Sequence, residues 1–139
     1  MYSHSFGVLH RDLKPDNILL SHSVRPNRPY RVIVTDFGLV KLGQGSLLET
    51  QEGISLGTPA YMSPEQCRGE DVDGRTDIYA LGVMLYETVV GKRPYPIRSL
   101  FDAAKFHNSG KLVTPRALNP AVPNELDELI RRMMAPSMM

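Results

Sequence analysis

The order of apolar and polar positions predicts two short strands in the first quarter of the chain. Residues 17–20, "NILL", end in a continuous apolar run that is typical of a short buried strand. Residues 31–35, "RVIVT", are rich in β-branched side chains and predict a second strand. The intervening "SHSVRPNRPY" contains two prolines and an asparagine, which favour a loop. We therefore expect a β-hairpin with Asp16 and Asn17 at its entry and Asp36 at its exit.

Later segments predict helices. In "RTDIYALGVMLYETVVGKRPYP", we expect Thr76 or a neighbour to cap the helix, Gly91 to end it and Pro94 to follow. Apolar residues on both faces indicate that this helix is buried nearly all round. The segments "PEQCRG" and "LFDAAKFHNSG" predict short helices. In "PNELDELIRRMMA" the pattern predicts an amphipathic helix whose apolar side consists of Leu126, Leu129, Ile130 and Met133.

Residues 42–63 are rich in Gly, Ser, Thr and Pro and indicate a long loop. Loops of this length in a compact domain are usually functional or disordered. We find no repeat, no low-complexity segment and no internal domain boundary. The 139 residues are enough for one ordinary domain with a core.

Composition narrows the classes of function. The formal net charge of +1 provides no electrostatic basis for binding nucleic acid or an anionic membrane. The single cysteine, Cys67, excludes an internal disulfide and is expected to be a packing or surface residue; the four scattered histidines do not predict a zinc site. The first residues lack the pattern of a secretory signal, and the longest apolar stretch contains Glu87 and is too short to span a bilayer. We expect a cytoplasmic protein.

The stretch "VLHRDLKPDNILL" carries candidate chemistry. In it, Asp12 can accept a proton or orient a hydroxyl, Lys14 supplies a point charge suited to phosphate, and the amide of Asn17 can bind a hard cation. Asp36 follows a β-branched strand, precedes Phe37-Gly38 and is a natural Mg²⁺ ligand. These are the parts that phosphoryl transfer requires. Taken singly, each residue has a structural interpretation as a turn former, a strand cap or a solvated charge.

Four motifs share one resemblance. "HRDLKPDN", "DFG", "GTPAYMSPE" and "TDIYALGVMLYE" occur in the order of the large lobe of a protein kinase, and over residues 3–135 the chain resembles bacterial serine/threonine kinases of the eukaryotic type. The resemblance implies an α+β fold for the complete family domain. For residues 1–139 it implies a partial domain that is mainly α, namely the C-terminal (large) lobe with a short β-hairpin at the catalytic loop.

The resemblance also implies roles for individual residues. Asp12 would be the catalytic base, and Lys14 would contact the transferred phosphate. Asn17 and Asp36 would hold the magnesium ions. Thr58 would form a hydrogen bond near Asp12 and Lys14.

Further residues would support or regulate the site by the same resemblance. His10 and Phe37 would stack in the core beneath it, and Glu65 would be the acid of the "APE" element, written "SPE" here. Asp77 would bind the backbone of the His10-Arg11 turn, and it is also a favourable acid for a helix N-terminus. Arg11 would pair with a phosphate on the activation loop, residues 36–65, whose candidate acceptors include Ser46, Thr50 and Ser55. The alternative for those hydroxyls is an ordinary solvated loop.

The expected parent activity is transfer of the ATP γ-phosphate, with Mg²⁺, to Ser or Thr hydroxyls of a protein substrate. The sequence contains no Gly-rich phosphate loop and no strand lysine of the "VAIK" type. We therefore expect that the ATP-gripping small lobe is needed in cis, and that this chain alone is inactive, marginally stable and prone to aggregation. Three alternatives stay open: a free-standing, non-catalytic binding module, a truncated reading frame, and a small-molecule phosphotransferase, which the substrate-seating "GTPAYMSPE" segment disfavours.

Overall fold

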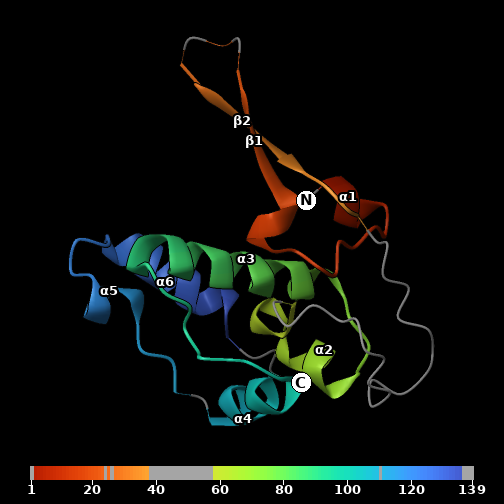
Figure 1. The fold of residues 1–139 in the computed structure, drawn as a ribbon, viewed down its shortest axis with the longest axis vertical. Helices are drawn as coiled ribbons and strands as arrows, with labels where there is room; N and C mark the ends of the chain where they lie inside the picture. The colour runs from red at the N-terminus through yellow and green to blue at the C-terminus, as the bar shows by residue number, and fades with distance from the viewer. Residues whose placement is uncertain (1, 24, 26, 38–57, 110, 136–139) are drawn as a thin grey trace.

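The structure is a computed structural model that describes residues 2–23, 25, 27–37, 58–109 and 111–135. A β-hairpin projects from a body of packed helices, and α3 runs through the middle of that body (Figure 1). The elements are α1 (Tyr2–Ser5), the 3-10 helix η1 (Pro15–Asn17), β1 (Ile18–His22), β2 (Tyr30–Val34), the 3-10 helix η2 (Thr58–Tyr61), α2 (Pro64–Arg68), α3 (Gly74–Val90), α4 (Leu100–Ser109), α5 (Pro115–Leu118) and α6 (Asn124–Met133).

The predicted hairpin is confirmed, but its predicted burial is wrong. β1 and β2 pair antiparallel, with Ile18 opposite Val34 and Leu20 opposite Val32. The side chains of Leu20 and Val32 are 66% and 62% exposed. The sequence pattern is that of a buried strand, yet the hairpin extends away from the helices, so no described helix covers it (Figure 1). The result is an exposed apolar surface on the hairpin.

Helix α3 agrees with the predicted helix at its end and differs at its start. Gly91 adopts a φ of 81° at the C-cap, where its N–H donates to the Glu87 carbonyl. The N-cap is Asp73, whose carboxylate accepts a hydrogen bond from the Arg75 backbone N–H at 2.8 Å. The prediction named Thr76 or a nearby residue; Thr76 itself is buried within the first turn, and the cap lies three residues before it. An Asp N-cap is as favourable as a Thr N-cap, so propensity alone does not separate the two.

The main core forms where α3 packs against α6. It consists of Tyr79, Val83 and Tyr86 from α3, with Ile130 and Met134 from the C-terminal region. Gly82 lies at this contact, because an added Cβ would come within 2.9 Å of Met133 Cβ. The expectation that α3 is buried all round is met only in part, since several of its apolar residues, such as Leu81 and Met84, are half-buried. Leu129, predicted on the apolar side of α6, is 48% exposed.

A smaller core cluster joins η2, α4 and the loop before α4. It contains Ala60, Ile97 and Ala103, with Tyr61 and Phe106 packed against it. The predicted helices at residues 64–69, 100–110 and 123–135 are confirmed as α2, α4 and α6. The short helix α5 was not predicted, because four residues are too few to display a helical period. Among the described residues, none of the helices has the length and hydropathy needed to cross a bilayer.

Candidate active site

The loop from His10 to Asn17 gathers the predicted catalytic groups around Asp12. Pro15 starts the single 3-10 turn η1, which brings Asn17 back against Asp12. Asn17 Nδ2 donates to the Asp12 backbone carbonyl at 2.8 Å and lies 3.4 Å from the carboxylate Oδ2. Lys14 Nζ forms an ion pair with that same Oδ2 at 2.9 Å. A carboxylate, an ammonium group and an amide therefore share one small loop.

The hairpin brings Asp36 to the same place. Asn17 directly precedes β1 and Thr35 directly follows β2, and the Thr35 backbone N–H donates to the Asn17 carbonyl at 2.9 Å. The Thr35 hydroxyl donates to Asp36 Oδ2 at 3.3 Å. Asp36 is exposed and has a φ of 58°, a left-handed conformation that is uncommon for a residue other than glycine. The register of the hairpin thus places Asn17 and Asp36 at one end of it.

Two oxygen donors at this end fit Mg²⁺. Because Nδ2 of Asn17 binds Asp12, the amide oxygen Oδ1 is the atom that Asn17 can offer to a cation. The Asp36 carboxylate would supply the second hard ligand. Within the described residues there is no group of three or more His, Cys, Asp or Glu side chains that could hold a metal. Such a pair suits an ion that usually takes one or two carboxylates together with phosphate oxygens and water.

His10 connects the loop to the end of the hairpin. Its side chain is 3% exposed, and Nε2 lies 2.7 Å from the Thr35 carbonyl. Nε2 must donate to that carbonyl, so Nδ1 is the acceptor for the Asp12 backbone N–H at 3.4 Å. The rings of His10 and Phe37 are 4.8 Å apart and tilted by 50°. The two rings do meet, but Phe37 is 46% exposed and does not lie in the core.

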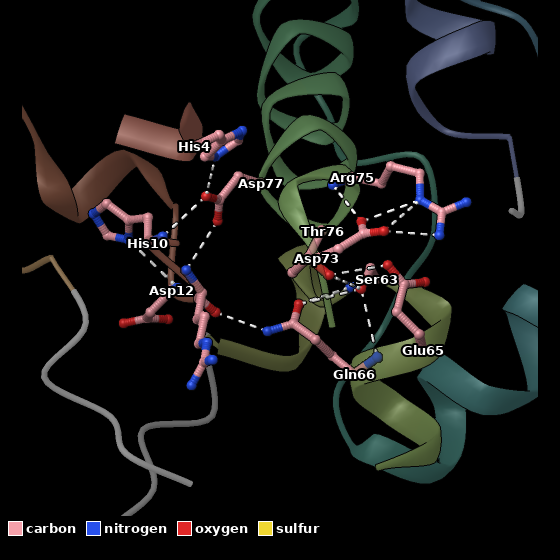
Figure 2. Close-up of polar contacts among 11 residues, drawn as sticks. His4, His10, Asp12, Ser63, Glu65, Gln66, Asp73, Arg75, Thr76 and Asp77 are labelled. Carbon is pink, nitrogen blue, oxygen red and sulfur yellow. Dashed lines mark hydrogen bonds and ion pairs between the residues drawn. The ribbon is translucent and has the colours of Figure 1, made fainter. Parts of the chain in front are cut away.

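The Asp77 carboxylate holds the loop from the first turn of α3 (Figure 2). Oδ1 accepts from the Arg11 backbone N–H at 2.9 Å, and Oδ2 accepts from the His10 backbone N–H at 2.9 Å. Oδ2 is also 2.8 Å from His4 Nε2. Asp77 is 4% exposed, so its charge is compensated by these donors instead of by water.

The sequence reasoning missed His4. It lies in α1, far from Asp77 along the chain, and no spacing rule connects the two residues. The structure shows that the contact depends on Gly74, because an added Cβ there would come within 2.7 Å of His4 Nδ1. The absence of a side chain at Gly74 lets the His4 ring lie against the start of α3.

Glu65 and its neighbours attach α2 to α3. Thr76 Oγ1 donates to Glu65 Oε1 at 3.0 Å, so this acid has a partner within the described chain. Ser63 caps α2 in a reciprocal capping box with Gln66. Gln66 was not predicted as a site residue, yet its Nε2 donates to the Arg11 carbonyl at 2.8 Å.

Cys67 lies next to Gln66 on α2. Burial raises the pKa of the Cys67 thiol to about 12, which agrees with the expected packing role.

Several predicted residues are not described in the same detail. Thr58 begins η2, but its side chain lies outside what the structure describes, as do Ser46, Thr50 and Ser55, which fall within residues 38–57. Arg11 has an exposed side chain and a backbone φ of 66°. A left-handed backbone costs a residue with a side chain about 1–2 kcal/mol. The hydrogen bonds to its N–H and its carbonyl offset that cost.

The His10–Asn17 loop presents a carboxylate, an ammonium group and an amide, and the Asp36 carboxylate follows the hairpin beside it. Groups of these kinds are the ones that phosphoryl transfer uses. The protein kinase domain family matches residues 1–139. The chain belongs to the protein kinase family.

Curated relatives agree with this assignment. Serine/threonine-protein kinase Pkn1 of Myxococcus xanthus is 42% identical over 133 residues, which are 96% of this chain and 19% of that protein. The DNA damage-responsive serine/threonine-protein kinase RqkA of Deinococcus radiodurans is 41% identical over 95% of this chain and 19% of its own length. Tyrosine-protein kinase MasK of Myxococcus xanthus is 38% identical over 93% of this chain and 19% of its own length. The chain therefore spans about a fifth of the length of these relatives.

Proposed function

We propose that the protein containing this chain transfers the γ-phosphate of ATP to Ser or Thr hydroxyls of other proteins. The observation that carries the proposal is the arrangement around Asp12, with Lys14 at 2.9 Å from its carboxylate and Asn17 bonded to its backbone. This arrangement stands beside Asp36 at one end of the hairpin. The relatives that are named serine/threonine-protein kinases support the reaction class.

In the proposed reaction, the acceptor hydroxyl lies against the Asp12 carboxylate. The hydroxyl oxygen forms a bond to the γ-phosphorus while the bond from that phosphorus to the β–γ bridging oxygen breaks. The hydroxyl proton passes to Asp12, and ADP leaves. Lys14 stabilises the negative charge on the transferred phosphoryl group, because its ammonium lies beside the carboxylate at which the acceptor binds.

Asn17 has two functions in this proposal. Its Nδ2 anchors the Asp12 backbone, and its Oδ1 joins the Asp36 carboxylate in holding Mg²⁺. The cation supplies neutralisation of phosphate charge when it is bound. Asn17 is 6% exposed, so its amide is held in one orientation.

We further infer that residues 1–139 form the large lobe of the kinase domain and are inactive alone. The exposed apolar hairpin supports this, because Leu19, Leu20 and Val32 are each more than half exposed and a soluble domain normally covers such a surface. A small lobe in cis, carrying the loop and lysine that grip ATP, is the proposed cover. Catalysis depends largely on positioning both substrates, which one lobe does not achieve. The cytoplasm is the proposed location.

The acceptor residue and the regulation belong to the same proposal. Lys14 in "HRDLKPDN" resembles the serine/threonine branch, whereas one relative is named a tyrosine kinase. Phosphoamino-acid analysis of the labelled substrate separates these two outcomes. The exposed Arg11 side chain would pair with a phosphate on Thr50 or Ser55 after activation.

The test uses the purified protein that contains this segment within its complete kinase domain. Incubation with [γ-³²P]ATP, Mg²⁺ and a Ser/Thr-containing acceptor protein is expected to label the acceptor. Asp12→Asn keeps the shape but not the base, and it should abolish labelling. Residues 1–139 alone should give no label. No labelling by the wild-type domain above the Asp12→Asn background would refute the enzyme and favour the non-catalytic binding module.

A further inference from the structure

Both peptide groups that flank Arg11 are held by hydrogen bonds to side chains of other elements. The Arg11 N–H binds Asp77 Oδ1 at 2.9 Å, and the Arg11 carbonyl accepts from Gln66 Nε2 at 2.8 Å. Arg11 sits between these bonds with a φ of 66°. Two side chains from α2 and α3 therefore hold the residue before Asp12 in a conformation that it would not adopt by itself.

We propose that Gln66 is a positioning residue that sets the orientation of the Asp12 carboxylate by holding the Arg11 carbonyl. The proposal rests on the function proposed above. The carbonyl of Arg11 and the N–H of Asp12 belong to one planar peptide group. Rotation of that plane changes ψ of Arg11 and φ of Asp12 together, and thereby moves the Asp12 side chain.

The contact between Gln66 and Arg11 is partly buried, and the buried partner is Gln66. Gln66 is 6% exposed, and the cavity bordered by Arg11, Asp12, Gln66 and Asp77 has a volume of about 10 Å³. That volume is at the lower limit for one water molecule. Water therefore does not readily replace the amide if the Gln66 donor is lost. Among the described residues, the Asp12 N–H has only the long 3.4 Å contact to His10 Nδ1, so the hydrogen bond to the Arg11 carbonyl is the stronger restraint on this peptide group.

Gln66 itself is held from behind. Its Oε1 accepts from the Ser63 backbone N–H at 3.1 Å and lies 3.4 Å from the Ser63 hydroxyl. Figure 2 shows Gln66 reaching from α2 toward the loop while Asp77 approaches it from α3. One end of the amide thus completes the cap of α2 and the other end fixes the catalytic loop. The position of α2 and the orientation of Asp12 are coupled through this one side chain.

The two ends of the amide can be separated by mutation. Gln66→Glu keeps an acceptor for the Ser63 N–H, which is the usual partner in a capping box, but an ionised carboxylate cannot donate to Arg11. Gln66→Met has a similar length and cannot donate at any pH. The Thr114 hydroxyl caps α5 by accepting a hydrogen bond from the Ala117 N–H at 3.3 Å. Thr114→Ala removes this cap and serves as a control for general loss of stability.

The experiment measures steady-state kinetics of the complete kinase domain at pH 8 with ATP, Mg²⁺ and the acceptor protein. Misplacement of a catalytic group by about 1 Å can cost about a hundredfold, so we expect kcat to fall about 10- to 100-fold in both Gln66 variants. KM for ATP should stay within about twofold, because the ATP ligands are untouched. Thr114→Ala should keep the wild-type kcat. If the wild type is active, Asp12→Asn is inactive and the Gln66 variants keep the wild-type kcat, the positioning role of Gln66 is overturned while the proposed kinase function stands.

A second measurement does not depend on activity. Hydrogen–deuterium exchange of the peptide covering residues 10–13 should become at least about tenfold faster in Gln66→Met than in wild type, because the Arg11 carbonyl bond no longer restrains the loop. The same peptide in Thr114→Ala should exchange as in wild type. Equal exchange in Gln66→Met and wild type overturns the proposal even if the domain proves to be inactive. If exchange is faster in Gln66→Met but the wild-type domain shows no kinase activity, the restraint of the loop by Gln66 is supported and the proposed enzymatic function is refuted.

Discussion

Protonation of His107 should weaken the folded state at mildly acidic pH. His107 lies on α4, half-buried, with its Nε2 3.0 Å from the Tyr79 hydroxyl and its ring edge-on to the Tyr79 ring. Its Nδ1 is buried and finds no hydrogen-bond partner among the residues that the structure describes. Burial lowers the pKa of His107 from 6.5 to about 4, with nearby Arg68 acting in the same direction. The folded protein therefore prefers the neutral imidazole.

The sign follows from proton counting. Below pH 6.5 His107 becomes protonated in the unfolded chain, whereas in the folded chain it stays neutral until about pH 4. This histidine thus contributes stability that is fully present above pH 6.5 and is lost as the pH falls toward 4. At pH 5 the complete linkage would amount to about 2 kcal/mol. Partial exposure of the ring reduces this to about 1 kcal/mol.

The assay is urea unfolding of the complete kinase domain between pH 7.5 and 5, compared with His107→Gln. Glutamine retains a polar partner for Tyr79 but does not titrate, so carboxylates and other histidines contribute equally to both proteins. The gap in unfolding free energy between wild type and His107→Gln should shift against wild type by about 1 kcal/mol from pH 7.5 to pH 5. Parallel pH dependences would refute the reasoning, as would an NMR titration that places the His107 pKa near 6.5.

Three further perturbations test other parts of the structure. Asp77→Ala leaves the buried N–H groups of His10 and Arg11 without an acceptor and should cost about 3 kcal/mol in urea unfolding, whereas Asp73→Ala, at the exposed cap, should cost about 1 kcal/mol; equal losses would contradict the role of Asp77. Gly82→Ala gains about 1 kcal/mol of helix propensity but pushes α3 from Met133 and Met134, so we expect a net loss of about 1 kcal/mol by thermal unfolding that Met134→Ala partly relieves. A stabilised Gly82→Ala protein would show that the helices separate freely. Paired Leu20→Thr and Val32→Thr substitutions should raise the monomer fraction of residues 1–139 in sedimentation velocity, while Leu129→Thr on α6 should leave it unchanged. Equal aggregation of the wild type, the hairpin double variant and Leu129→Thr would contradict the view that the hairpin is the surface through which residues 1–139 aggregate.

Local chemistry was readable from the sequence because it depends on short spacings. Asp12, Lys14 and Asn17 lie within six consecutive positions, so one proline-initiated turn is enough to bring them together. The glycine stop at Gly91 was equally predictable, since its φ of 81° is a conformation that glycine adopts at little cost. The hairpin followed from β-branched runs and turn residues.

Burial could not be read in the same way. "NILL" has the composition of a buried strand, but whether Leu20 is covered depends on which element packs over the hairpin. The face that α6 presents was also misjudged at Leu129, because a helical pattern identifies an apolar side without specifying how much of that side its neighbour covers. Phe37 was expected in the core but is 46% exposed, because its burial also depends on which elements pack over it.

The reactive groups and the turns that present them could be read from the sequence, because Asp12, Lys14, Asn17 and Asp36 each lie in a short, recognisable stretch. The contacts that hold the catalytic loop in place could be seen only in the folded structure. His4 and Gln66 contact the loop or its anchor Asp77 through single hydrogen bonds between segments far apart in the chain. Such contacts have no local periodicity or spacing, because they arise only when α1, α2 and α3 are packed together.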